Sequence, residues 1–108
     1  MIDDPSQQKP SETAAFAAFD LGIQLEQSED LEGAARVYRQ AVDSAHQSET
    51  EPGQAVGAQA AFNLGSILEQ NEDSEGLFQA YRESLELGRL SGTTVGREAG
   101  ASAGFNLG

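Results

Sequence analysis

Two clusters of carboxylates are the side chains whose type and spacing could form a cation site. The clusters are Glu29, Asp30 and Glu32, and Glu72, Asp73 and Glu75. Carboxylate oxygens bind Ca²⁺, but neither cluster has the alternating oxygen ligands and central glycine of a calcium loop. Acidic side chains also favour the positive N-terminal end of a helix. We therefore expect these residues to cap helices and predict no metal site.

Catalytic chemistry has little support in the sequence. The only histidine, His46, lies near the end of a predicted helix, where a cation is mildly favoured. No serine or threonine has a base beside it in a readable motif, and the absence of cysteine excludes disulfides and thiolate metal sites. No strand precedes a glycine-rich phosphate loop. We expect no enzyme, no catalytic residue and no cofactor.

The charge of the chain is strongly acidic, with 18 acidic residues against 6 basic ones and a net charge of −12. Nucleic acids and anionic membranes both require a basic surface, so neither is an expected partner. The charge either keeps an alanine-rich protein soluble or attracts a basic partner. The N-terminus lacks a secretory signal, and no apolar run is long enough to span a membrane. A cytoplasmic location is therefore expected, and the preference for arginine over lysine suggests a bacterial origin.

One six-residue stretch occurs three times. The sequence AAFDLG at 17–22 returns as AAFNLG at 60–65 and as AGFNLG at 103–108, each time 43 residues later. The match extends well beyond these residues, because LEQSEDLEGAARVYRQA at 25–41 aligns with LEQNEDSEGLFQAYRES at 68–84. A fixed period of this length is typical of arrays in which each unit packs on its neighbours.

Each unit has the pattern of two helices joined by a short acidic turn. In the first helix, small and apolar residues recur every three or four positions, namely Ala18, Leu21, Gly22 and Leu25. The second helix carries a similar series, which is Leu31, Ala34, Ala35, Tyr38, Ala41 and Val42 in the first copy and Leu77, Phe78, Tyr81 and Leu85 in the second. The pattern predicts an αα-hairpin in each unit.

The spacing of these residues resembles the tetratricopeptide repeat family over residues 15–108, and Sel1-like repeats are the near alternative. The matching positions are Ala18, Leu21, Gly22, Leu25, Ala34, Tyr38 and Ala41, and then Ala61, Leu64, Gly65, Leu68, Leu77, Tyr81 and Ser84. The resemblance implies an all-α fold, a right-handed αα-hairpin solenoid. It would contain two repeats plus an unpaired first helix of a third, about five helices in all.

The predicted organisation is a disordered segment at 1–10 and a repeat domain at 11–108. Repeat 1 spans about 11–50, repeat 2 about 53–91 and a partial repeat 3 about 94–108. The period of 43 residues exceeds the family's usual period of about 34. Because Glu51-Pro52-Gly53 is a break-and-restart signal, we expect the first helix of the second repeat to start a turn or two early.

The resemblance also implies a function, because tetratricopeptide arrays bind a peptide or helix in a concave groove lined by their first helices. The corresponding positions here are Phe16, Phe19, Ile23, Glu26, Gln27, Gln59, Phe62, Ser66, Glu69, Gln70, Ser102 and Phe105. Phe19, Phe62 and Phe105 would form an aromatic ladder in that groove. Alternatively, the phenylalanines belong to the core and the Glu-Gln pairs are solvated.

The expected partner is a protein or peptide that is apolar with some basic residues. The best-known family variant clamps a C-terminal carboxylate with Lys, Asn and Arg, whereas this sequence has Phe and Glu at the corresponding points. Acidic C-terminal tails are therefore not expected ligands. The alternative function is structural: residues 94–108, as an incomplete repeat, would promote self-assembly into a homo-oligomer.

Overall fold

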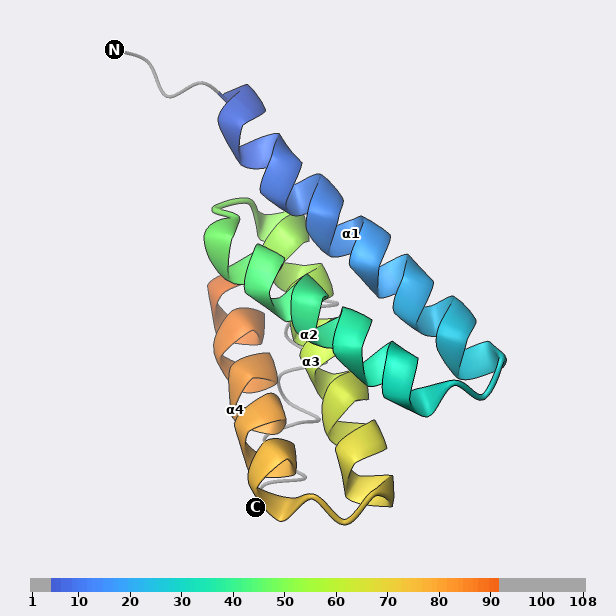
Figure 1. The fold of residues 1–108 in the computed structure, drawn as a ribbon. Helices are drawn as coiled ribbons and strands as arrows, with labels where there is room; N and C mark the ends of the chain where they lie inside the picture. The colour runs from blue at the N-terminus through green and yellow to red at the C-terminus, as the bar shows by residue number, and fades with distance from the viewer. Residues whose placement is uncertain (1–4, 92–108) are drawn as a thin grey trace.

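The computed structural model describes residues 5–91, which form four helices (Figure 1). The helices are α1 (Pro5–Gln27), α2 (Leu31–Gln47), α3 (Glu51–Gln70) and α4 (Ser74–Ser91). Residues 5–91 contain no strand, so the all-α prediction is confirmed for this part of the chain. The predicted fifth helix at 94–108 and the site residues Ser102 and Phe105 lie outside the described residues.

Neighbouring helices in the sequence are also neighbours in space. Helix α1 packs against α2, α3 packs against α4, and α2 and α3 join the two pairs (Figure 1). Helix α1 also reaches α3. It begins at Pro5 and so includes residues 5–10, which the sequence analysis assigned to a disordered segment. Pro10 lies inside this helix and supplies no N–H to it.

The turn between α1 and α2 combines a helix stop with a helix start. The amide of Glu29 donates to the Glu26 carbonyl, and the amide of Asp30 donates to the Leu25 carbonyl, which is the Schellman pattern. Glu29 therefore takes a left-handed conformation with φ 64°. The Asp30 side chain then accepts a bond of 3.0 Å from the amide of Gly33. The expectation that the acidic cluster caps a helix is confirmed here.

The turn between α3 and α4 repeats this arrangement 43 residues later. The matching residues are Glu72, Glu69, Asp73, Leu68 and Gly76. The two acidic clusters thus have the same local geometry, and in each the positive φ falls on a glutamate where glycine is the usual residue.

The connection from α2 to α3 is built around Thr50, the N-cap of α3. Its hydroxyl accepts a bond of 3.1 Å from the Gly53 amide and donates one of 2.7 Å to the Glu12 carboxylate. The second bond ties α1 to the start of α3. Helix α3 begins at Glu51, with Pro52 in its first turn. The predicted early start of this helix is confirmed.

The largest buried side chains are the tyrosines of the second helix in each pair. Tyr38 is fully buried against Gly22, and Tyr81 is almost fully buried against Gly65. A Cβ atom at Gly22 would overlap the Tyr38 ring, and one at Gly65 would lie 2.5 Å from the Tyr81 ring. Alanine is the commonest of the other buried residues, so the helices approach closely and each of these side chains buries little area.

Two apolar residues that the sequence analysis placed on packed faces are exposed. Leu21 is 44% exposed, although its counterpart Leu64 is only 4% exposed. The reason is the position of the two helices: among the described helices, α3 packs against α1, α2 and α4, whereas α1 packs against α2 and α3. Phe78 on α4 is 53% exposed. Both residues fit the helical spacing of a packed face, but none of the described helices covers them.

Replacing Gly65 with alanine should destabilise the protein, although alanine normally favours a helix over glycine. The new methyl group must displace the Tyr81 ring, and overpacking of this kind costs about 1–3 kcal/mol. Urea unfolding of Gly65→Ala, of Tyr81→Leu and of the double variant measures the effect. In the double variant, Gly65→Ala should lower the free energy of unfolding much less than it does alone, because the Tyr81 ring is absent. Increased stability of the single Gly65→Ala variant would show that the ring is not seated there.

Replacing Glu29 or Glu72 with glycine should stabilise the protein by about 1 kcal/mol each, because glycine adopts a positive φ without steric cost. Thermal or urea unfolding measures the change. The matched control is Glu32→Gly in the first turn of α2, where φ is helical and glycine should destabilise by about 0.5–1 kcal/mol. Equal destabilisation at all three positions would contradict the left-handed geometry.

Candidate binding face

The predicted groove residues of the first repeat lie along one side of α1. Phe16, Phe19, Ile23 and Glu26 are separated by three or four positions, which places them in one stripe. Phe16 is 41% exposed, whereas Phe19, Ile23 and Glu26 are half-buried. Gln27 is exposed at the end of the helix.

A corresponding stripe follows α3. Gln59, Phe62 and Ser66 are half-buried, and Glu69 and Gln70 at the end of the helix are exposed. Because α1 and α3 contact each other, the two stripes belong to neighbouring helices. We call these two stripes together the first-helix face.

A Phe-Tyr-Glu cluster lies beneath the first stripe. The rings of Phe19 and Tyr38 have centroids 5.9 Å apart with an interplanar angle of 45°. The Tyr38 hydroxyl donates a hydrogen bond to the Glu26 carboxylate and accepts one of 3.4 Å from the Asn63 amide. Since Asn63 comes from α3, this cluster joins α1, α2 and α3. The half-buried Phe19 ring therefore contributes to the core as well as to the surface.

The second helix pair repeats the cluster. The rings of Phe62 and Tyr81 have centroids 5.6 Å apart with an interplanar angle of 35°. The Tyr81 hydroxyl donates to the Glu69 carboxylate at 3.3 Å and lies 3.5 Å from the Ser66 hydroxyl. Each cluster thus presents a phenylalanine ring supported by a buried tyrosine, with a glutamate at its edge.

The environment of Tyr38 affects its ionisation. The pKa of the Tyr38 hydroxyl lies well above its ordinary value of 10.0, mainly because the group is buried. The hydrogen bond to Glu26 raises this pKa further. The bond from Asn63 acts in the opposite direction. The hydroxyl therefore keeps its proton and remains a donor to Glu26 through the neutral pH range.

Sequence reasoning missed the hydrogen bonds of three residues in this region, Asn63, Tyr38 and Tyr81. Asn63 was not among the predicted site residues, although it differs from its counterpart Asp20 in an otherwise matching stretch. Asn63 can donate a hydrogen bond to the Tyr38 hydroxyl, whereas an ionised Asp20 can only accept. The tyrosines were predicted only as packing residues, and their hydroxyl partners lie on adjacent helices, 12 to 25 residues away in the sequence.

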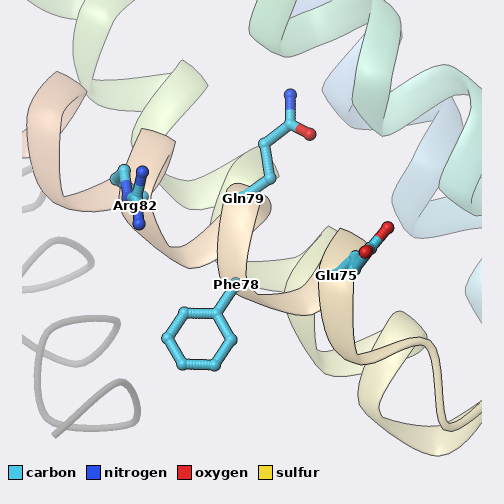
Figure 2. Close-up of a pocket in the computed structure, with 4 residues that line it drawn as sticks. All are labelled: Glu75, Phe78, Gln79 and Arg82. Carbon is cyan, nitrogen blue, oxygen red and sulfur yellow. The ribbon is translucent and has the colours of Figure 1, made fainter.

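A pocket that the sequence did not suggest lies on α4 (Figure 2). Its space is about 620 Å³, and its lining side chains are Glu75, Phe78, Gln79 and Arg82. These positions are three, four and seven residues apart, so they form one side of the helix. Two of the lining positions differ between the copies: Phe78 stands where the first copy has Ala35, and Gln79 where it has Arg36.

Arg39 of α2 forms a structural ion pair with Glu83 of α4. The Arg39 guanidinium donates two hydrogen bonds of 2.8 and 2.9 Å to the Glu83 carboxylate. The His46 ring nitrogen lies 3.4 Å from the same carboxylate. His46 thus lies beside an anchoring ion pair. Within residues 5–91, no group of three or more histidine, aspartate or glutamate side chains could hold a metal ion.

No protein-family model, curated protein or solved structure matches the chain. The resemblance to tetratricopeptide repeats therefore stays a prediction that depends on the spacing of residues. None of the four described helices is both long enough and apolar enough to cross a membrane.

The raised pKa of Tyr38 predicts a loss of stability at alkaline pH. The unfolded chain releases the tyrosine proton at about pH 10, while the folded chain retains it. The contribution of the buried Tyr38 hydroxyl to the free energy of unfolding is therefore fully present below pH 10. Above pH 10 it falls by about 1.4 kcal/mol per pH unit. Unfolding free energies between pH 9 and 11, compared with those of Tyr38→Phe, measure this slope. Equal slopes in the two proteins would contradict the burial of the Tyr38 hydroxyl.

Proposed function

We propose that this protein is a protein–protein interaction module that binds a peptide or helix of its partner across the first-helix face. We also propose that its two helix pairs are tetratricopeptide-like repeats of a right-handed αα-hairpin solenoid, with Sel1-like repeats as the alternative. The observation that carries the proposal is the repetition of the Phe-Tyr-Glu cluster in both pairs. Repeated sites of this kind suit an extended ligand, because each copy meets successive side chains of the ligand.

The aromatic side chains supply the apolar part of the proposed interaction. Phe16 is exposed, and the Phe19 and Phe62 rings each lie against a buried tyrosine. Aromatic residues contribute strongly to interfaces, because they bury a large area and lose few rotatable bonds. A ring already held by its neighbours loses still less conformational freedom on binding.

The charge of the face favours a basic partner. Glu26 and Glu69 lie at the edges of the two clusters, Asp20 is exposed on α1, and the whole chain carries a net charge of −12. A segment with lysine or arginine beside apolar residues complements this pattern. Electrostatic attraction of this type increases the association rate and weakens as salt screens it.

Self-assembly is the second candidate function. It is favoured by the exposure of Leu21 on the first helix and of Phe78 on the last described helix. Apolar residues at both ends of a repeat array permit head-to-tail contacts between copies. This function predicts that the average mass in light scattering rises with protein concentration.

The proposal can be tested with a displayed library of random peptides and the immobilised full chain. Enriched peptides should combine apolar and basic residues, and their affinity should decrease as salt increases. Phe16→Ser should weaken the best peptide about tenfold or more, as expected for an aromatic anchor. The matched control is Phe78→Ser, which changes a similarly exposed ring (53%, against 41% for Phe16) on α4 rather than on the first-helix face and should bind normally.

Loss of binding only in the Phe78→Ser variant would move the site to the α4 pocket and contradict the proposal. A library that yields no peptide, together with a mass that rises with concentration, would favour the structural function instead.

A further inference from the structure

The four side chains that line the α4 pocket are arranged symmetrically along the helix. Glu75 and Arg82 lie at the two ends of the pocket, and Phe78 and Gln79 point to opposite flanks of the helix between them (Figure 2). All four residues are exposed. Glu75 precedes Phe78 by three residues and Arg82 follows Gln79 by three, so the set is centred between residues 78 and 79.

The two charges at the ends of the α4 pocket form no ion pair with any residue of the described range 5–91. By contrast, the counterpart of Arg82 in the first copy is Arg39, which binds the Glu83 carboxylate at 2.8 Å. Glu75 and Arg82 do not bind each other, because seven residues span about 10 Å of helix. Both charges can therefore bind groups of a partner.

A two-fold axis between residues 78 and 79 would make this arrangement complementary to itself. When two copies of a helix pack antiparallel about such an axis, residues above the axis meet residues below it, and residues beside the axis meet their own copies. Glu75 then faces the partner's Arg82, and Arg82 faces the partner's Glu75. The two Phe78 rings meet on one flank of the helices, and the two Gln79 side chains meet on the other.

We propose that the protein forms a two-fold homodimer in which the α4 helices of two copies pack antiparallel across their α4 pockets. Each dimer contains two ion pairs between Glu75 and the partner's Arg82. Between these pairs the Phe78 rings, each 53% exposed in the single chain, bury their free surface against each other. A Gln79 amide both donates and accepts hydrogen bonds, so the two amides can bind each other. This contact closes on itself, whereas head-to-tail contacts continue from copy to copy.

A second copy suits the α4 pocket better than an unrelated peptide does. The pocket has an acidic end, an aromatic centre and a basic end, so its partner must carry the same features in the reverse order. An antiparallel copy of α4 supplies this order without any further requirement on the sequence. The apolar and basic peptides proposed as ligands of the first-helix face would instead bring a positive charge toward Arg82.

The proposed interface is small, and this sets the strength of the dimer. Four side chains from each copy bury less than the roughly 1,200–2,000 Å² of a standard stable interface, so the dimer should be weak and reversible. The net charge of −12 also opposes the approach of two copies, and salt screens this repulsion. The association should therefore be measured near physiological ionic strength and at high protein concentration.

The dimer is independent of the binding function proposed above. Its contacts lie on α4, whereas the first-helix face lies on α1 and α3, so dimerisation neither requires nor blocks that face. Peptide binding and self-association are also measured separately, which makes the failure of one proposal distinguishable from the failure of the other.

Charge-reversal variants of the full chain test the pairing by analytical ultracentrifugation. Glu75→Arg makes both ends of the pocket basic, and Arg82→Glu makes both ends acidic, so each variant alone should remain monomeric. An equal mixture of the two variants should dimerise, because each end of one copy then faces the opposite charge on the other. The double variant Glu75→Arg/Arg82→Glu should dimerise like the unmodified protein.

Two further variants separate the contact from effects of net charge and helix stability. Phe78→Ser should raise the dissociation constant of the dimer about tenfold or more, because it removes both rings at the axis. Glu32→Arg makes the same charge change as Glu75→Arg, in the first turn of α2 instead of α4, and should leave the dimer unchanged. Circular dichroism should show that each variant remains helical.

A dimer with no larger species in the unmodified protein, together with dimerisation of the mixed charge variants, supports the proposal. A protein that stays monomeric up to millimolar concentration would overturn it. So would a mass that keeps rising beyond that of a dimer, which is the result expected of head-to-tail assembly. Equal loss of dimer in Glu32→Arg and Glu75→Arg, or no dimer in the mixture, would also overturn the proposed pairing.

Discussion

The contact between a tyrosine ring and a glycine within each helix pair fixes the geometry on which the rest of the structure depends. Tyr38 occupies the space left by Gly22, and Tyr81 occupies that left by Gly65. Among the residues that the structure describes, alanine is the commonest of the other buried residues, and no other fully buried side chain is as large as these two rings. The rings therefore set how closely the two helices of each pair approach and which residues of the first helix face outward.

The same tyrosines connect the core to the proposed binding face. Each ring supports a phenylalanine, and each hydroxyl donates to a glutamate at the end of the first helix. Asn63 extends this network from the first pair to the second. A substitution at a tyrosine would thus alter packing and the face together, whereas Phe16 on the surface can be changed with little effect on the core.

The local features were the ones that the sequence could predict. Asp30 caps its helix because capping depends on residues within one turn, and α3 begins at the Glu51-Pro52-Gly53 signal for the same reason. The exposure of Leu21 and Phe78 could not be predicted, because it depends on which helix covers each face. The Asn63–Tyr38 bond joins residues 25 positions apart, and the Arg39–Glu83 pair joins residues 44 positions apart, so no local spacing indicates either contact. The α4 pocket escaped prediction because Phe78 fits the helical period of a packed residue.

The most direct test of this account is the proton chemical shift of Gly22 and Gly65 in solution. An aromatic ring in contact with a glycine displaces the Hα resonances of that glycine, because the circulating π electrons create a local magnetic field. Both glycines should have strongly displaced Hα shifts. The displacement at Gly22 should disappear only in Tyr38→Leu, and that at Gly65 only in Tyr81→Leu. Ordinary glycine shifts in the unmodified protein, or displacements that persist without the tyrosines, would contradict the account.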